Sequence, residues 1–380
     1  MREKPGLYVH FPFCFHKCHY CDFNSYLYQK KLVLAYLRKL YQEMAHYSQF
    51  YPEVKTVYVG GGTPTCLSPE LLGSLFHKIN ENFVQGPIET TVEANPETLS
   101  LEKLEVMREV GVNRLSIGVQ SFQGALLQIL GRQHTIREIN LAIEQARAAG
   151  GFSINLDLIY GIPGQTISDW EDTLRKAVEY TPDHLSIYCL TLEEGTPLRE
   201  MVERGHFTLP EEEKILVMEA LAYDILSQYG YQQYEISNFS LPGKSCLHNL
   251  IYWRNEDYLG VGAGAWSYLN GERFGNVRLP EEYIEFMERN EIPRGTGERL
   301  SGKAEMAETL ILGLRLVGGI SQERFQNRFG RNWEEVFPHG ISRMREFGLL
   351  EKAGENLQLT PRGRQLANEV FVEFWREADS

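Results

Sequence analysis

Residues 11–23 read FPFCFHKCHYCDF, in which Cys14, Cys18 and Cys21 have the spacing C-x3-C-x2-C. Three closely spaced thiolates can ligate three irons of a [4Fe–4S] cluster and leave the fourth iron open. An open iron can bind a small molecule in addition to relaying an electron. Zinc is the alternative, because two histidines lie nearby, but structural zinc takes four ligands and C-x2-C pairs usually come twice. The spacing therefore favours a cluster with one open iron.

Composition narrows the class of protein. The chain has 380 residues, of which 43% are hydrophobic, and a net charge of −13. This length suits two or three domains, and the acidic balance argues against nucleic acid as a partner. The start, MREKPGLYVHFPF, lacks the apolar run and cleavage site of a secretory signal, and no stretch is apolar for the length of a membrane span. We therefore expect a cytoplasmic protein with reduced thiols, in which Cys66, Cys189 and Cys246 are small buried side chains.

Strand and helix patterns alternate along the first half of the chain. Six strand–helix units predict a parallel sheet wrapped by helices with right-handed crossovers. Both a partial (β/α)6 barrel and an open doubly wound sheet fit this alternation. We favour the α/β partial barrel, because polar residues recur where the strands end. The predicted strands are 7–11, 56–59, 89–93, 114–119, 153–159 and 184–189, and the predicted helices are 30–49, 69–82, 101–110, 124–130, 136–149 and 168–180.

Polar side chains and glycines follow these strands. The segment GGGTPT, residues 60–65, allows close approach of the backbone to a ligand, although it is equally compatible with a simple tight turn. A charged group that faces into a barrel mouth needs a partner or a ligand. Taken together, two acids, an amide and an arginine could hold the hydroxyl, amino and carboxylate groups of one ligand, whereas each taken singly could be a solvated loop charge. These residues are Glu93, Gln120, Arg132 and Asp157.

Five segments carry a resemblance to a known family. YVHFPFCFHKCHYC, GGGTPT, VEANPE, GVQSF and DLIYGIPGQT resemble the radical S-adenosylmethionine superfamily, and more closely its coproporphyrinogen-dehydrogenase-like family. The resemblance covers nearly the whole chain. It implies a [4Fe–4S] cluster on Cys14, Cys18 and Cys21, S-adenosylmethionine on the fourth iron, and an electron donor for the cluster; it assigns no catalytic residue. The cofactor-binding residues that it implies are Tyr8, Tyr20, Gly61, Gly62, Thr63, Glu93, Gln120, Arg132 and Asp157.

Two departures separate this sequence from the decarboxylating members of that family. Phe23 stands where those members carry a fourth cysteine, and only seven residues precede Tyr8 where they carry a long extension. Both differences argue against decarboxylation of a porphyrinogen.

A second segment, CLHNLIYW (residues 246–253), resembles the H-N-x-x-Y-W motif of the HemW-type haem chaperones, a branch that also lacks the fourth cysteine. A neutral imidazole is a standard axial ligand of haem iron, although a lone histidine is more often a hydrogen-bonded core residue. By this resemblance His248 is the haem-binding residue, and the chain binds haem and passes it to a client haemoprotein. The alternative is an oxygen-independent coproporphyrinogen III dehydrogenase or a related radical enzyme.

The pattern changes near residue 301. Helices at 302–316, 322–329 and 333–347, a hairpin and a final helix resemble a small winged-helix domain. Its acids and bases nearly cancel, which argues against DNA binding and favours a lid or docking surface over the barrel mouth. Within it, Arg315 and Arg343 are candidate partners for haem propionates.

The sequence thus divides into three parts. Residues 1–235 form the radical SAM partial barrel, 236–300 a connecting segment with the H-N-x-x-Y-W motif, and 301–380 the C-terminal winged-helix-like domain. Transient membrane contact, for example through the acid-rich stretch 210–229, and a homodimer stay open.

Overall fold

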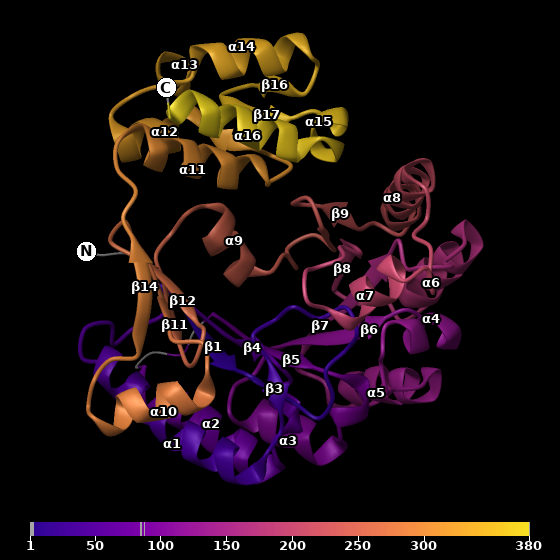
Figure 1. Cartoon of the computed structure of the whole chain (residues 1–380), viewed down its shortest axis with the longest axis vertical. Helices are drawn as coiled ribbons and strands as arrows, with labels where there is room; N and C mark the ends of the chain where they lie inside the picture. Colours follow the sequence, from indigo (N-terminus) through magenta and orange to yellow (C-terminus); the bar gives the residue numbers. More distant parts are fainter. Residues whose placement is uncertain (1–3, 84–85, 87, 380) are drawn as a thin grey trace.

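The computed structural model describes residues 4–83, 86 and 88–379. Within these residues, six parallel strands lie side by side in chain order at the centre of a 12-stranded sheet (Figure 1). An open doubly wound sheet would reverse its strand order at a switch point. The consecutive order therefore confirms the partial barrel. The six strands are β1 (Gly6–Phe11), β4 (Thr56–Gly61), β5 (Glu89–Ala94), β6 (Arg114–Gln120), β7 (Ser153–Tyr160) and β8 (His184–Cys189).

The connecting helices pack on the outer face of this sheet (Figure 1). Two of them begin at reciprocal capping pairs, Thr135 with Glu138 and Thr166 with Asp169, in which side chain and backbone satisfy each other's hydrogen bonds. The helices are α1 (Lys30–Tyr47), α2 (Pro69–Asn82), α3 (Leu101–Glu109), α4 (Gly124–Ile129), α5 (Ile136–Ala149) and α6 (Ile167–Glu179), with the 3-10 turns η1 (Pro64–Cys66) and η2 (Pro96–Thr98). The cysteine loop is bracketed by β2 (Phe13–Cys14) and β3 (Tyr26–Leu27).

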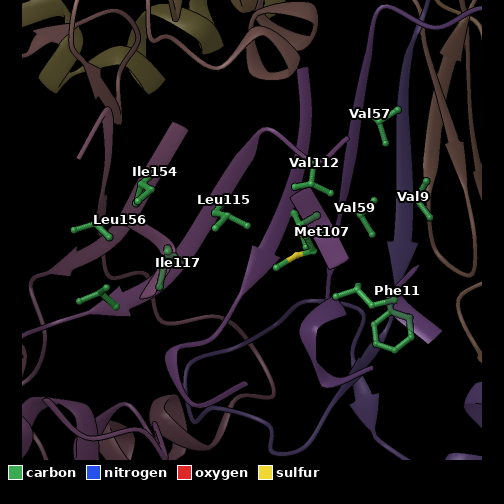
Figure 2. Close-up of a cluster of buried hydrophobic side chains, with 14 of the residues drawn as sticks. Val9, Phe11, Val57, Val59, Met107, Val112, Leu115, Ile117, Ile154 and Leu156 are labelled. Atoms are coloured by element: carbon green, nitrogen blue, oxygen red, sulfur yellow. The ribbon is translucent and has the colours of Figure 1, made fainter. Parts of the chain in front are cut away.

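Side chains alternate strictly along the barrel strands, because successive residues of a strand point to opposite faces. Val57 and Val59 of β4, and Leu115 and Ile117 of β6, are fully buried in the apolar cluster shown in Figure 2. The residues between them, such as Ser116, line a cavity inside the barrel. The helices thus cover an apolar face, and the interior is polar.

The predicted connecting segment, 236–300, is built into the same sheet. Tyr258 pairs with Gly6, so that β11 continues the parallel sheet past β1 and covers an edge that would otherwise be open. The three-part division of the chain stays a prediction. The elements from residue 197 to 298 are α7 (Pro197–Glu203), α8 (Glu212–Gln228), β9 (Gln232–Gln233), β10 (Asn238–Ser240), α9 (Leu247–Trp253), β11 (Tyr258–Val261), β12 (Trp266–Leu269), β13 (Glu272–Asn276), α10 (Pro280–Glu288) and β14 (Arg294–Glu298).

The C-terminal region has an apolar cluster of its own and a three-stranded sheet. The helix predicted at 333–347 is two helices, because Pro338 has no N–H and cannot continue the first one. The elements are α11 (Lys303–Leu314), β15 (Ile320–Ser321), α12 (Gln322–Phe329), α13 (Trp333–Val336), α14 (Pro338–Glu346), β16 (Leu350–Ala353), β17 (Asn356–Leu359), α15 (Pro361–Gln365) and α16 (Ala367–Ala378).

This region docks at the amino ends of the barrel strands, where Asn255 donates to Thr309 over 3.0 Å and Arg324 pairs with Glu256 at 3.2 Å. Both contacts lie beside the starts of β1 and β11. The expectation of a lid over the mouth that holds the cysteines is therefore wrong. Among the described helices, none is long and apolar enough to cross a membrane.

Candidate functional site

The three cysteines of the first motif open on one cavity inside the barrel. Cys14 ends β2, and the loop after it is held by a hydrogen bond of 2.9 Å from the His19 N–H to the Leu130 carbonyl. Cys14, Cys18 and Cys21 are half-buried, and all three line a cavity of about 350 Å³. The cavity runs from this loop, at the carboxyl ends of the strands, to residues at their amino ends.

Each cysteine sulfur has a polar neighbour that can donate to it. The Thr63 hydroxyl lies 3.3 Å from the Cys14 Sγ, and Arg132 donates to the Cys18 Sγ over 3.4 Å. The Ser25 hydroxyl lies 4.0 Å from the third sulfur. Donors of this kind orient thiolate ligands and tune the potential of an iron–sulfur cluster.

The donor chemistry fits a cluster held by three thiolates. Burial raises the pKa of the Cys14 thiol to about 11 and also raises that of Cys21, so ligand binding there must release protons. Among the described residues, no three histidine, cysteine or acidic side chains are placed so that they could bind one metal ion together. The fit therefore rests on the three thiols and their donors.

The glycine loop after β4 packs directly against the cysteine strand. Gly61 has a φ of +104°, and the Gly62 N–H donates to the Phe11 carbonyl over 2.8 Å. A Cβ on Gly62 would lie 2.6 Å from the backbone nitrogen of Phe13. Close approach of backbone to backbone requires these glycines, and the same approach brings Thr63 to Cys14.

Glu93 is a half-buried acid on the cavity wall. It accepts hydrogen bonds from the Tyr58 hydroxyl at 2.8 Å and the Gly61 N–H at 2.9 Å. Burial raises the pKa of Glu93 to about 7, and the two donors oppose that rise. A ligand with a cationic amino group would offset the cost of the buried charge.

Arg132 reaches across the same wall. It donates to the Asn95 amide oxygen at 3.1 Å and to the Gly118 carbonyl at 2.8 Å, while its buried Nε has no partner. Asn95 in turn donates to Thr63 over 3.2 Å. Gln120 is the last residue of β6 and has a φ of +67°. This left-handed backbone conformation is strained for a residue other than glycine, and such strain is often found at binding sites.

Asp157 is a second half-buried acid of the cavity. Ser116 and Asn155 each donate to one of its oxygens at 2.9 Å, and burial raises the pKa of its carboxyl group. Tyr20, from the cysteine loop, lines the cavity together with Asp157. Two acids and an arginine thus face one space with the capacity to bind amino, hydroxyl and carboxylate groups.

The structure brings the predicted cluster and cofactor residues together, with one exception. Tyr8 is on β1 but is absent from the cavity lining, and its hydroxyl lies 2.9 Å from the Nδ1 of His10. The binding roles of all these residues stay predictions. The predicted residues that line the cavity are Cys14, Cys18, Tyr20, Cys21, Gly61, Gly62, Thr63, Glu93, Gln120, Arg132 and Asp157.

His248 lies at the opposite end of the barrel, in α9, and is fully buried. Its Nδ1 is 2.7 Å from the Thr56 hydroxyl and its Nε2 is 2.9 Å from the Tyr252 hydroxyl. Burial lowers the pKa of its imidazole to about 3, so the ring is neutral. Neither nitrogen is free in this arrangement. Ligation of haem iron by His248 stays a prediction, and it requires that the hydrogen bond to Tyr252 or to Thr56 breaks.

Sequence reasoning did not single out several residues of the site. Asn95, which ties Arg132 to Thr63, follows Glu93 by two residues and would have been found from the alternation of strand faces. Ser116 and Asn155 donate hydrogen bonds to Asp157. The alternation of strand faces would have identified these two residues as well. Cys189 was expected to be buried, but it is exposed and lines the cavity. The reason is that Cys189 is the last residue of β8, at the open mouth of the barrel.

Comparisons with known proteins agree with this geometry. A model of the radical SAM superfamily matches residues 8–177, and one of the HemN C-terminal domain matches residues 300–366. The haem chaperone HemW of Bacillus subtilis is 39% identical over 97% of this chain and 99% of its own length. HemW of Lactococcus lactis is 38% identical over 98% of each chain. This chain belongs to the HemW family of radical SAM proteins.

A solved structure extends the comparison for this HemW-family chain. Coproporphyrinogen III oxidase (HemN) of Escherichia coli, a radical SAM enzyme, superimposes with a TM-score of 0.84 and 25% identity, over 98% of this chain and 90% of that one. The radical SAM fold implies a [4Fe–4S] cluster and S-adenosylmethionine. In this HemW-family chain, the cavity with the three cysteines has the residues to hold both.

Proposed function

We propose that this chain is a haem chaperone, which binds haem and passes it to a client haemoprotein while its barrel holds one [4Fe–4S] cluster and S-adenosylmethionine. The observation that carries the proposal is identity of 32–39% with HemW haem chaperones, in several of them over nearly their whole length. The helix that contains His248 and Trp253 supports it, since the same segment resembles the motif of that branch.

The residues of the cavity have distinct tasks in this proposal. Cys14, Cys18 and Cys21 hold the cluster, while Thr63 and Arg132 donate to two of the sulfurs. The acids of the cavity, Glu93 and Asp157, and the Gln120 amide orient the polar groups of S-adenosylmethionine, together with Tyr20 and the glycine loop. When bound, the cluster and S-adenosylmethionine supply one-electron and radical chemistry.

Further parts of the proposal concern partners and compartment. The six cysteines are free thiols, as expected for a protein of the reducing cytoplasm, where we place this activity. An electron donor for the cluster and a client haemoprotein are its proposed partners. Transient membrane contact and a homodimer stay predictions from the sequence.

The second candidate function is oxygen-independent coproporphyrinogen III dehydrogenation. The structural similarity to HemN favours it. Against it, Phe23 is exposed beside the cysteine loop, at the position where the family resemblance of the sequence implies a further cysteine in decarboxylating members.

One experiment separates the two functions. The cluster is reconstituted anaerobically in the full-length protein, and haem binding and coproporphyrinogen III turnover are measured side by side. We expect a stoichiometric haem complex, transfer of haem to an apo-haemoprotein, and no decarboxylated product. Turnover of coproporphyrinogen without a haem complex would reject the proposal.

The cluster assignment has its own control in the same preparation. Cys18→Ser removes one of three ligands, so we expect iron and sulfide to fall from four each per chain to well below one. Cys189→Ser, at an exposed cysteine of the same cavity, keeps the full content. Equal loss in both variants would show that the triplet is not the ligand set.

A further inference from the structure

The barrel cavity has a floor at the amino ends of the strands. Every second residue of a strand points to the same face of the sheet. Arg114, the first residue of β6, therefore lines the cavity together with Ser116 and Gln120 of the same strand. The seven residues of β6 span about 20 Å, and Gln120 stands at the end that faces the cysteine loop. Arg114 lies at the opposite end of the cavity from the three cysteines.

Arg114 is a buried cation with few partners. Its residue is 3% exposed, and its Nη1 donates to the Ser153 hydroxyl at 3.4 Å and to the Lys244 carbonyl at 3.3 Å. Among the described residues, no acid forms an ion pair with Arg114, and its Nε and Nη2 have no hydrogen-bond partner. A buried charge without a partner is unfavourable, and arginine does not lose its proton. The floor of the cavity is therefore suited to a ligand with a negative charge.

The acid at the start of the neighbouring strand is already engaged. Glu89, the first residue of β5, accepts the Leu247 and His248 N–H groups at 3.0 Å each, and one of its oxygens lies 3.5 Å from the Cys246 Sγ. Both oxygens of Glu89 thus bind the start of α9. Arg114 keeps two N–H donors that the protein itself does not use.

A second unpartnered group lies beside Arg114. Thr91 is its register partner on β5, so the two side chains point into the barrel next to each other. Thr91 is fully buried and lines the cavity, and its hydroxyl has no hydrogen-bond partner in the part of the chain that the structure describes. Buried hydroxyl groups are nearly always partnered. Further along the strands the polar groups satisfy one another, since Asn155 donates to Ser116 at 2.7 Å and lies 2.6 Å from the His184 Nδ1.

The two unused nitrogens of Arg114 are the pair that fits a carboxylate. In a guanidinium group the Nε–H and Nη2–H bonds point in the same direction, so that together they bind both oxygens of one carboxylate. One guanidinium balances one negative charge, and the Thr91 hydroxyl can donate to or accept from a further oxygen of the same ligand. The cavity of about 350 Å³ also contains the predicted cofactor residues, so that only a small molecule has room on its floor.

We propose that the floor of the barrel binds a small organic monocarboxylate, with its carboxylate on the Nε and Nη2 of Arg114 and a hydroxyl or carbonyl oxygen on Thr91. The ligand class is the 2-hydroxy and 2-oxo acids, whose second oxygen stands next to the carboxylate as Thr91 stands next to Arg114. The site goes beyond the proposed function, because it involves neither haem nor the C-terminal region. It gives the chain a place for a second organic molecule in the cavity of the cofactor residues.

The test uses lactate, a 2-hydroxy acid, and acetate, which has the carboxylate alone. Each is titrated by calorimetry into the full-length protein with a reconstituted, oxidised cluster and saturating S-adenosylmethionine, which occupies the open iron. We expect lactate to bind with a dissociation constant in the millimolar range or below, and acetate to bind at least three-fold more weakly. Absence of lactate binding would overturn the proposal. Lactate that binds only without S-adenosylmethionine would be a ligand of the open iron, and this result would overturn the proposal as well.

Arg114→Lys keeps the positive charge and removes the paired N–H donors. We expect the dissociation constant of lactate to rise at least ten-fold, because an ammonium group cannot bind both oxygens side by side. Arg175→Lys, at an exposed ion pair on α6, is the matched control and should stay within two-fold of the wild type. Circular dichroism and iron content check that each variant is folded. If Arg114→Lys does not fold, Thr91→Val decides the outcome.

Thr91→Val gives a result that a merely structural role of Thr91 would not. Valine has nearly the same shape and lacks the hydroxyl group, which has no partner in the protein. Without ligand we expect a melting temperature equal to or above that of the wild type. The dissociation constant of lactate should rise at least three-fold, while that of acetate stays unchanged. Unchanged lactate binding in Thr91→Val would overturn the site, and a haem titration of the same preparation reports separately on the proposed function.

Discussion

Two glutamates, Glu43 and Glu93, show how the surroundings of a carboxyl group decide its role. Burial raises the pKa of both Glu43 and Glu93 to about 7. Glu93 lines the barrel cavity that also contains the three cysteines. Glu43 is enclosed in the core, where the Gly262 N–H and the Asn276 amide donate to it at 2.7 Å and the Tyr283 hydroxyl at 2.6 Å. Glu43 is therefore a structural group, which ties α1 to the turn after β11.

Glu43→Gln changes the pH dependence of stability. The folded pKa of about 7 exceeds the ordinary value of 4.5, so folding favours the protonated form. The stability contributed by Glu43 is fully present below pH 4.5 and is lost as the pH rises through 7, by roughly 3 kcal/mol in all. Glutamine does not titrate. We expect the wild type to lose its advantage over Glu43→Gln between about pH 4.5 and pH 7, as measured by urea unfolding; a constant difference would contradict the assignment.

Gly62→Ala tests the contact between the glycine loop and the cysteine strand. The new Cβ would lie 2.6 Å from the Phe13 backbone nitrogen, which cannot move like a side chain. We expect a loss of about 1–3 kcal/mol in the free energy of unfolding, with lower cluster occupancy. Gly124→Ala, in open space on α4, should instead stabilise by about 0.4–1 kcal/mol. Equal effects of the two changes would rule out the steric argument.

At the scale of elements, α9 depends on a residue of a distant strand. The two oxygens of Glu89, at the start of β5, accept the Leu247 and His248 N–H groups at 3.0 Å each. A negative charge at a helix N-terminus satisfies unpaired N–H groups and the helix dipole. Glu89 therefore anchors the start of α9.

Glu89→Gln removes the charge and one acceptor. We expect the protein to lose about 1–2 kcal/mol of stability and the amides of residues 247–253 to exchange faster with deuterium. Glu102→Gln, an exposed acid in the first turn of α3, is the control and should cost less than about 0.5 kcal/mol. Protection of α9 that is unchanged in Glu89→Gln would show that packing alone holds it.

The barrel strands and helices were predictable because the local sequence of each shows which side chains are buried and where the element begins. The strands at 56–59 and 114–119 carry an apolar residue at every second position, and the helices at 69–82 and 136–149 begin at a cap. Other elements were missed, two of them for clear physical reasons. Pro338 interrupts a helix whose apolar pattern continues, and β11 was not predicted as part of the barrel sheet, since its pairing with β1 joins residues some 250 positions apart.

At the scale of the whole molecule, two apolar clusters meet across a polar interface. Arg273 of β13 pairs with Glu308 of α11, and Arg328 donates to the Asn255 carbonyl and to the Tyr268 hydroxyl. Such an interface depends on the geometry of its polar contacts more than on buried apolar area.

Arg273→Met leaves the Glu308 carboxylate, which is 8% exposed, without its partner. We expect a loss of about 2–3 kcal/mol and faster hydrogen exchange in α11, while β6 stays protected. Adding Glu308→Met should restore most of the loss. Arg175→Met, at an exposed pair on α6, should cost less than about 1 kcal/mol. Uniform loss of protection in both regions would mean that they unfold as one unit.

The sequence by itself predicted the partial barrel and the cysteines, glycines and acids that line one cavity, because cysteine spacing and period-two alternation are local properties of the chain. It could not place His248, since the contacts with Thr56 and Tyr252 depend on how α9 closes the amino ends of the strands. Only the tertiary structure decided that the H-N-x-x-Y-W segment lies at the end of the barrel opposite the cysteines and that the C-terminal region closes a second cavity over it. The physical reason is that the walls of a cavity come from several distant segments of the chain. The walls of this one come from residues between 234 and 356, which only folding brings together.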